Sequence, residues 1–184
     1  MTIRQFDVFC GNRGFIVSIE IERKFLVTSD DWKVLVRGSQ CVRQGYIARS
    51  SRGKVRVRCS GTTAFLTIKG PRKGISRTEF EYPIAVDDAE EMLQTVCLQP
   101  VLEKTRYEVV HAGLLWEIDA FTGDAAGLVL AEVELKQDDQ LVVLPPWVGR
   151  EVTHDKRYRS SAIALRKQVA HTAPAENEAL RLGS

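Results

Sequence analysis

The segment IEIERKFLV, residues 19–27, decides the fold class of this chain. Glu20, Glu22 and Lys24 occupy alternate positions, and mostly apolar side chains lie between them. Successive side chains of a β-strand point to opposite faces of the sheet. A repeat of two residues therefore predicts a strand with one charged face and one apolar face.

Segments of the same kind recur along most of the chain. Turns that contain glycine, such as 50–53, 70–74 and 123–127, separate them. The further predicted strands are 40–48, 54–60, 63–69, 76–84, 101–111, 114–121 and 128–136, which makes about eight with the first. Many strands with short turns and few helices predict a closed β-barrel with helices packed outside, and a β-sandwich is the alternative that the pattern also allows.

Three helical segments interrupt the series of strands. Residues 29–31 can cap a short helix. A second helix is expected to begin at Asp87, with Glu90 completing a capping box, and to end at Pro100. The segment 155–168 is predicted to be partly helical. We expect the second and third helices to cover the apolar outer faces of the strands.

One face of nearly every predicted strand carries ionised side chains that are sorted by sign. The acidic positions are Glu20, Glu22, Glu79, Glu81, Glu117, Asp119, Glu132 and Glu134, and the basic ones include Arg56, Arg58, Lys69, Lys104 and Arg106. Any one strand fits a half-exposed sheet with its charged face in water. Like charges two residues apart repel each other, however, so sheet stability alone does not favour the whole set.

Closing the sheet would bring these charged faces together inside the barrel. A dry interior could not hold them, because each buried ion costs several kcal/mol unless it is paired. A water-filled tunnel could bind a polyanion through its arginines and lysines and divalent cations through its carboxylates, since hard cations prefer oxygen ligands. The chain has no GxxxxGK[ST] motif, so P-loop chemistry is excluded.

Composition excludes several other classes of protein. The net charge of +2 gives no basic field for nucleic acid. No apolar run approaches the ~20 residues that a membrane-spanning helix needs, and the first residues lack a signal-peptide pattern, so we expect a cytoplasmic protein without a membrane partner. The four cysteines have no CxxC spacing, which argues against a zinc site or disulfides and for reduced thiols.

Ordered motifs follow the ExExK pattern of Glu20, Glu22 and Lys24. They are RQGYI, KVRVRCSG, FLTIKGPRKGISRTEFEYPI, LEKTRYEV, WEIDAF, AGLVLAEVEL and LPPWVGREVTHDKRY. This set, over roughly residues 18–165, resembles the CYTH superfamily of triphosphate tunnel metalloenzymes, and most of all its short bacterial branch with inorganic triphosphatases. The resemblance implies an α+β fold with an eight-stranded antiparallel tunnel barrel, Mg²⁺ or Mn²⁺ as cofactor, and often a homodimer.

The resemblance also implies roles for single residues. The phosphate-binding residues implied by the motifs are Lys24, Arg56, Arg58, Lys69, Lys104 and Arg106, with Arg43, Lys73 and Lys156 as further contacts. The acidic side, which holds metal ligands and their neighbours, comprises Glu20, Glu22, Glu81, Glu117, Asp119, Glu132 and Glu134. Lys24 and Tyr46 are the expected catalytic residues: Tyr46 couples to Lys24, which contacts phosphate or positions the attacking water.

The implied activity is hydrolysis of a triphosphate, most simply inorganic triphosphate to diphosphate and phosphate. A class IV adenylate cyclase or a thiamine triphosphatase on the same fold, and a non-catalytic polyphosphate-binding module, are the alternatives. The charged faces carry no clear set of aromatic side chains to stack on a base or a thiazolium, because Phe80 and Trp116 lie on the apolar faces. This favours a substrate without an organic tail.

We expect three parts along the chain. Residues 18–169 form the tunnel domain, and 170–184 form a flexible C-terminal tail. Residues 1–17 show no sustained period, and we hypothesise that the natural start lies near Val17, so that they are an extension outside the native protein. The intact mass of the protein from its native source would test this hypothesis.

Overall fold

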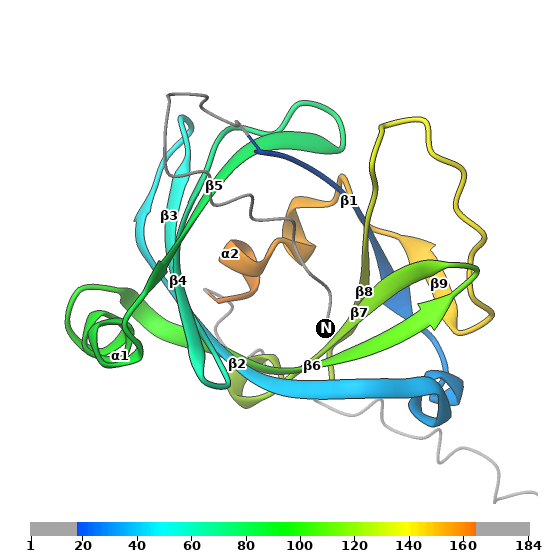
Figure 1. Cartoon of the computed structure of the whole chain (residues 1–184), viewed down its shortest axis with the longest axis horizontal. Coiled ribbons are helices and arrows are strands. Elements are labelled where there is room, and N and C mark those ends of the chain that lie inside the picture. The colour runs from blue at the N-terminus through cyan, green and yellow to red at the C-terminus, as the bar shows by residue number, and fades with distance from the viewer. Residues whose placement is uncertain (1–17, 165–184) are drawn as a thin grey trace, which may run out of the picture.

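Eight antiparallel strands form a closed ring in the computed structural model, which describes residues 18–164 (Figure 1). In chain order they are β1 (Ser18–Val27), β2 (Val36–Arg49), β3 (Lys54–Ser60), β4 (Thr63–Lys69), β5 (Ser76–Ile84), β6 (Leu98–His111), β7 (Leu114–Phe121) and β8 (Val129–Glu134). The order around the sheet is β5-β4-β3-β2-β6-β7-β8-β1, and a β5–β1 pairing closes it. The predicted eight-stranded barrel is confirmed, and the sandwich alternative is wrong.

Strand β1 closes the barrel because both of its edges are used. Residues Glu22 to Leu26 pair with β8 on one edge. On the other edge, Ser18 to Ile21 pair with β5, and Phe25 and Val27 pair with a ninth strand, β9 (Val148–Glu151). This strand lies outside the ring of eight and was not among the predicted strands. The segment that carries the ExExK motif is therefore anchored by three neighbouring strands.

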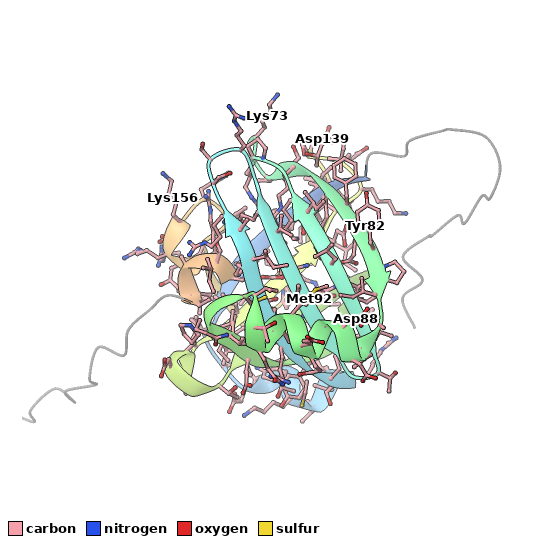
Figure 2. The ribbon with its side chains drawn as sticks, turned by 90° about the vertical axis from the view of Figure 1, so that its left-hand side faces the viewer. Lys73, Tyr82, Asp88, Met92, Asp139 and Lys156 are labelled. Atoms are coloured by element: carbon pink, nitrogen blue, oxygen red, sulfur yellow. The ribbon has the colours of Figure 1, made fainter. Side chains whose placement is uncertain are left out.

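Two apolar clusters cover the outer faces of the barrel. One lies over β1, β6, β7 and β8 and includes Trp116 and Trp147, whose rings meet edge to face with centroids 5.6 Å apart. The other lies beneath α1 (Val86–Thr95), whose Ala89 and Leu93 pack against Val57 of β3 and its neighbours. Figure 2 shows α1 crossing the outside of the sheet. The prediction that this helix covers an apolar outer face of the strands is confirmed.

A third cluster fills part of the inside of the barrel. A 3-10 turn, η3 (Lys156–Tyr158), leads into the short helix α2 (Ser160–Ile163), which Figure 1 shows within the ring of strands. Ile163 packs against inward-facing Leu102 and Leu130. The expectation that this segment covers an outer face is wrong, because these inward-facing side chains are apolar and need a cover of their own. The interior is apolar where α2 packs and charged elsewhere.

The details of the predicted helices differ from the structure. The segment after residues 29–31 is a 3-10 helix, η1 (Asp31–Leu35). Helix α1 has Ala85 as its N-cap and no side-chain cap, because alanine has no side-chain acceptor; Asp87 lies in the first turn, and Glu90 contacts Arg43 of β2. The helix ends at Thr95, before Pro100, which lies in β6. Two further 3-10 turns, η2 (Gly123–Ala125) and η3, complete the structure.

Some predictions from the sequence concern residues beyond those that the structure describes. The proposed extension at 1–17 and the tail at 170–184 lie outside it, and the tunnel domain is described as far as Ala164. Of the described cysteines, Cys59 and Cys97 are buried and Cys41 is exposed, and the reduced state of the thiols stays a prediction. Across residues 18–164, no helix is long and apolar enough to span a membrane.

Replacement of Gly45 tests the packing of α1 and the residues after it against β2. A Cβ at this position would lie 2.7 Å from Cys97 Cβ and 3.0 Å from Leu93 Cδ2. We expect Gly45→Ala to lower the free energy of unfolding by about 1–3 kcal/mol through overpacking, measured by urea denaturation. Gly38→Ala in the same strand is the control, since its Cβ would meet only Glu108 Oε2 at 3.8 Å. Equal stability of the two variants would contradict this packing.

Candidate active site in the barrel interior

Charged side chains line a cavity inside the barrel. Its open space is about 730 Å³, including the part open to solvent. The lining residues are Glu20, Glu22, Lys24, Tyr46, Lys54, Arg56, Arg58, Lys69, Arg72, Arg77, Arg106, Glu117, Glu132, Glu134, Arg159 and Ser160. Within the described part of the chain, nine cations and five carboxylates therefore face this space. The excess of positive charge suits a small polyanion.

Alternation along the strands builds this lining. Glu20, Glu22 and Lys24 of β1 face the cavity. Arg23, between them, points to the outside, where its Nε lies 3.0 Å from Glu151 Oε1. The charged face that the sequence predicts for β1 is thus the inner face of the barrel. The alternative, in which this charged face lies outside in water, fits the strand less well.

Lys69 of β4 lies between two carboxylates. Its Nζ is 2.9 Å from Glu20 Oε1 and 2.6 Å from Glu79 Oε2. Burial alone would raise the pKa of Glu20, but the charges of Lys69 and Arg77 outweigh it and hold that pKa well below its usual value. Burial raises the pKa of Glu79 despite Lys69, and the charge of Glu20 adds to the rise. Glu20 is therefore the more acidic member of the pair.

Arg106 of β6 is the centre of a second cluster. Its Nε and Nη2 each lie 2.7 Å from a different oxygen of Asp119, and Nη2 lies 3.1 Å from Glu132 Oε2. Lys104 also contacts Asp119, whose side chain is fully buried. Burial would raise the pKa of Asp119, but Arg106 and Lys104 hold it below its usual value. The fork of Arg106 is therefore fixed from beneath by Asp119.

Lys24 is held by Glu132 and by the segment before α2. Its Nζ lies 2.6 Å from Glu132 Oε1 and donates to the Tyr158 carbonyl oxygen at 3.4 Å. Burial would lower the pKa of Lys24, but the charges of Glu132 and Glu22 outweigh it and raise the pKa, so the ammonium stays charged. Tyr46 also lines the cavity, and burial raises its pKa against the charges of Arg56 and Lys24.

Arg56 and Arg58 of β3 face the cavity from the neighbouring side. Arg58 Nη2 donates to Glu81 Oε1 at 2.9 Å. Arg56 Nη2 donates to Thr67 Oγ1 at 3.2 Å, and its buried Nε has no hydrogen-bond partner in the described structure. A buried donor without a partner is costly, so Arg56 has hydrogen-bonding capacity that a bound anion could use.

Sequence reasoning missed five of the lining residues: Lys54, Arg72, Arg77, Arg159 and Ser160. Two of them could have been found by parity, because Lys54 shares the face of Arg56 and Arg77 shares the face of Glu79. Arg72 contacts Glu22 from the turn between β4 and β5. Arg159 and Ser160 lie where α2 begins. Arg72, Arg159 and Ser160 lie outside the strands, so a two-residue repeat could not have identified them.

Most of the predicted site residues line the cavity, but several do not. The eleven that do are Glu20, Glu22, Lys24, Tyr46, Arg56, Arg58, Lys69, Arg106, Glu117, Glu132 and Glu134. Asp119 and Lys104 are buried under Arg106, and Glu81 is held by Arg58 and Thr67, so these three support the lining residues instead.

The three further phosphate contacts are placed elsewhere. Arg43 is on the outer face of β2, where it pairs with Glu90 and lies 3.4 Å from Glu103. Lys73 and Lys156 are exposed at the periphery of the molecule (Figure 2). None of these three residues lines the cavity, so their contact with a phosphate stays a prediction.

The carboxylates of the cavity could hold a metal ion only after a rearrangement. In residues 18–164, no three acidic, histidine or cysteine side chains are grouped so that they could hold one as they stand. Glu20, Glu22 and Glu132 are instead each held by lysine or arginine. The donor chemistry, several carboxylates along one cavity, fits a hard divalent cation, but only if these oxygens leave their present partners.

Comparison with known proteins shows which family and which relatives this chain resembles. The CYTH domain profile matches residues 18–166. An inorganic triphosphatase of Acetivibrio thermocellus is 46% identical over 142 residues, which cover 77% of this chain and 90% of that protein. One of Nitrosomonas europaea is 42% identical over 151 residues, covering 79% and 97%. The crystal structure of the inorganic triphosphatase NE1496 matches with a TM-score of 0.58 and 39% identity, covering 80% of this chain and 99% of that one.

The fold and the cavity together define an antiparallel barrel with a charge-lined interior binding site. The chain belongs to the CYTH domain family, since the family match spans residues 18–166 and the relatives are more than two-fifths identical. The predicted family membership is confirmed.

Replacement of Asp119 tests whether the arginine fork depends on its buried partner. We expect Asp119→Asn to lower the free energy of unfolding by about 3–5 kcal/mol, because Arg106 and Lys104 would keep buried charges without compensation. Chemical denaturation measures the effect. Glu117→Gln is the control, since the Glu117 side chain is 30% exposed and contacts the same arginine. Equal losses in the two variants would show that Asp119 has no special role in the cluster.

Proposed function

We propose that this protein hydrolyses inorganic triphosphate to diphosphate and phosphate with a divalent cation, Mg²⁺ or Mn²⁺. The observation that carries the proposal is the cavity lined by nine cations and five carboxylates in a chain of this family. Inorganic triphosphate is a compact polyanion, and phosphoryl transfer requires mainly positioning and charge stabilisation. The names of the two relatives support the same substrate.

The cations of β1, β3, β4 and β6 are proposed to hold the phosphate groups. Arg56, Arg58 and Arg106 carry planar forks that can each donate two hydrogen bonds to one phosphate. Lys24 and Lys69 act as point charges. All five are buried or nearly so, and carboxylates hold them in place before the substrate arrives. Such preorganised charges stabilise a transition state without further rearrangement of the protein.

Carboxylates on the cavity wall are the proposed ligands of the divalent cation. Of the lining acids, Glu20, Glu22, Glu132 and Glu134 lie on the paired strands β1 and β8, where Glu22 is opposite Glu134 and Lys24 opposite Glu132. A bound divalent cation would neutralise phosphate charge and lower the pKa of a bound water. Glu81 and Asp119, which we expected among the acids, would act from behind Arg58 and Arg106.

Binding of the triphosphate is proposed to exchange ion-pair partners. Arg72 and Arg77 now contact Glu22, and Arg77 also contacts Glu20. A phosphate oxygen can replace a carboxylate oxygen at each guanidinium, which frees the carboxylate for a divalent cation. Anion and cation would then favour each other's binding, since each removes a competing partner of the other.

Tyr46 and Lys24 are the residues proposed to act nearest the reacting atoms. The raised pKa of the Tyr46 phenol keeps it protonated, so that it can donate a hydrogen bond. The charged ammonium of Lys24 can hold a phosphate oxygen or orient the water that attacks in line. Water adds to the terminal phosphorus, the P–O bond to the leaving diphosphate breaks, and a carboxylate accepts the proton of the water.

The lining of the cavity also supports a substrate without an organic tail. Among the cavity residues within 18–164, Tyr46 is the only aromatic side chain, whereas a base or a thiazolium would be expected to stack on several. The free thiols of Cys41, Cys59 and Cys97 support a reducing compartment, and we propose the cytoplasm as the place of action.

Phosphate release tests the substrate and the cofactor together. Inorganic triphosphate, ATP and thiamine triphosphate are compared side by side with Mg²⁺, with Mn²⁺ and with EDTA. We expect strong preference for inorganic triphosphate and loss of activity in EDTA. Release from none of the three would contradict the proposed reaction, and an assay of cyclic AMP formation and of polyphosphate binding would then distinguish the remaining activities on this fold.

Two substitutions test the cavity as the active site. We expect Arg58→Ala and Glu22→Ala each to lower kcat/KM at least ~10²-fold, comparable to the loss of one preorganised charge contact. Arg23→Ala and Glu151→Ala are matched controls, because this ion pair lies on the outer face of the same strand region. Rates like those of the wild type in a folded Arg58→Ala protein would exclude the assignment of the site.

A further inference from the structure

Among residues 18–164, two cavity cations differ from the other seven in having no carboxylate within 4 Å. Seven of the nine contact a carboxylate within 4 Å: Lys24, Arg56, Arg58, Lys69, Arg72, Arg77 and Arg106. Lys54 and Arg159 contact none among residues 18–164. A charged group that faces a cavity without compensation raises the question of what neutralises it.

Lys54 is the first residue of β3 and reaches α2. Its Nζ donates a hydrogen bond to the buried hydroxyl of Ser161. The charges that act on it most strongly are positive: Arg159 beside α2, Arg77 of β5, Arg49 of β2 and Arg72 of the turn before β5. Burial, followed by these four charges, lowers the pKa of Lys54 to about 8. Lys69, its register partner on β4, adds another cation on that side.

Arg159 approaches the same place from the other end of the chain. It is the N-cap residue of α2, and Ser160 beside it also lines the cavity. The Arg159 Nε is buried and has no hydrogen-bond partner in the part of the chain that the structure describes. Burial, and then the charges of Arg72 and Arg77, lower the pKa of Arg159. Neighbouring cations thus repel both side chains, and no carboxylate of residues 18–164 forms an ion pair with either.

We propose that Lys54 and Arg159 form the docking position for a terminal phosphate group of the substrate. A terminal phosphate carries more charge than a bridging one, and it can supply the acceptors that the Arg159 Nε and the Lys54 ammonium lack. A bound anion attracts each of the surrounding cations and so offsets their mutual repulsion. The inference rests on the proposed function, and it adds a direction: one end of the triphosphate is fixed beside α2.

This docking position joins two distant parts of the chain. Lys54 belongs to β3, whereas Arg159 precedes α2, whose Ile163 packs inside the barrel. A phosphate held by both would fasten α2 to the barrel wall. Slower amide hydrogen exchange in α2 on phosphate binding is therefore an expected consequence that does not depend on catalysis.

The experiment compares Lys54→Met and Arg159→Met with the wild type, and Arg157→Met is the matched control. Arg157 is exposed and already paired with Asp155. We expect each Met variant to raise KM for inorganic triphosphate about tenfold or more, the effect of losing one charge-assisted hydrogen bond, with kcat affected much less. We also expect weaker binding of inorganic phosphate by calorimetry. Unchanged KM and unchanged phosphate binding in both variants would overturn the inference.

A conservative variant covers the possibility that a Met variant fails to fold. In the wild type, KM should rise as pH rises through about 8, because Lys54 then loses its charge. Lys54→Arg keeps the charge at these pH values, so its KM should lose that rise. An identical pH profile in Lys54→Arg would overturn the role of Lys54.

The failure of the inference can be distinguished from the failure of the proposed function. If the wild type hydrolyses no triphosphate, the proposed reaction is wrong, but calorimetry with inorganic phosphate still tests the docking position. If the wild type is active and both Met variants bind and turn over like the Arg157→Met control, the reaction stands and the docking position is wrong.

Discussion

Ion pairing inside the barrel is the constraint on which the rest of the structure depends. A closed sheet that turns its charged faces inward must neutralise them, because each unpaired buried ion costs several kcal/mol. Strand order solves this by placing bases next to acids: Lys69 of β4 reaches Glu79 of β5, and Arg106 of β6 reaches Asp119 of β7. The cations paired in this way have fixed positions before any ligand binds.

The same pairing explains how one cavity could serve both an anion and a cation. Carboxylates hold the arginines in place, yet phosphate oxygens compete for the same donors. Glu20 and Glu22 share Arg77, so replacement of one partner loosens both acids. Lys54 and Arg159 stand apart from this arrangement, since no carboxylate of residues 18–164 forms an ion pair with either. The cavity thus contains two kinds of cation. Seven are neutralised by carboxylates of the chain, whereas Lys54 and Arg159 would be neutralised by the phosphate.

The sequence predicts the strands and their faces well because a period of two residues is a local property. It places Glu20, Arg58 and Glu132 on the inner face correctly. It cannot predict which inner groups reach the cavity, since Asp119 is covered by the side chain of another strand. Arg72 and Arg159 lie outside the strands, where no period applies. The position of α2 inside the barrel also depends on tertiary packing, which no local pattern encodes.

A crystal structure with Mn²⁺ and diimidotriphosphate, in which two P–N–P bridges resist hydrolysis, tests the exchange of partners most directly. We expect the anion to contact Arg56 and Arg58, Arg72 and Arg77 to leave Glu22, and anomalous signal from manganese to appear beside the freed carboxylates. An anion bound with every present ion pair intact, or a metal ion far from these acids, would contradict it.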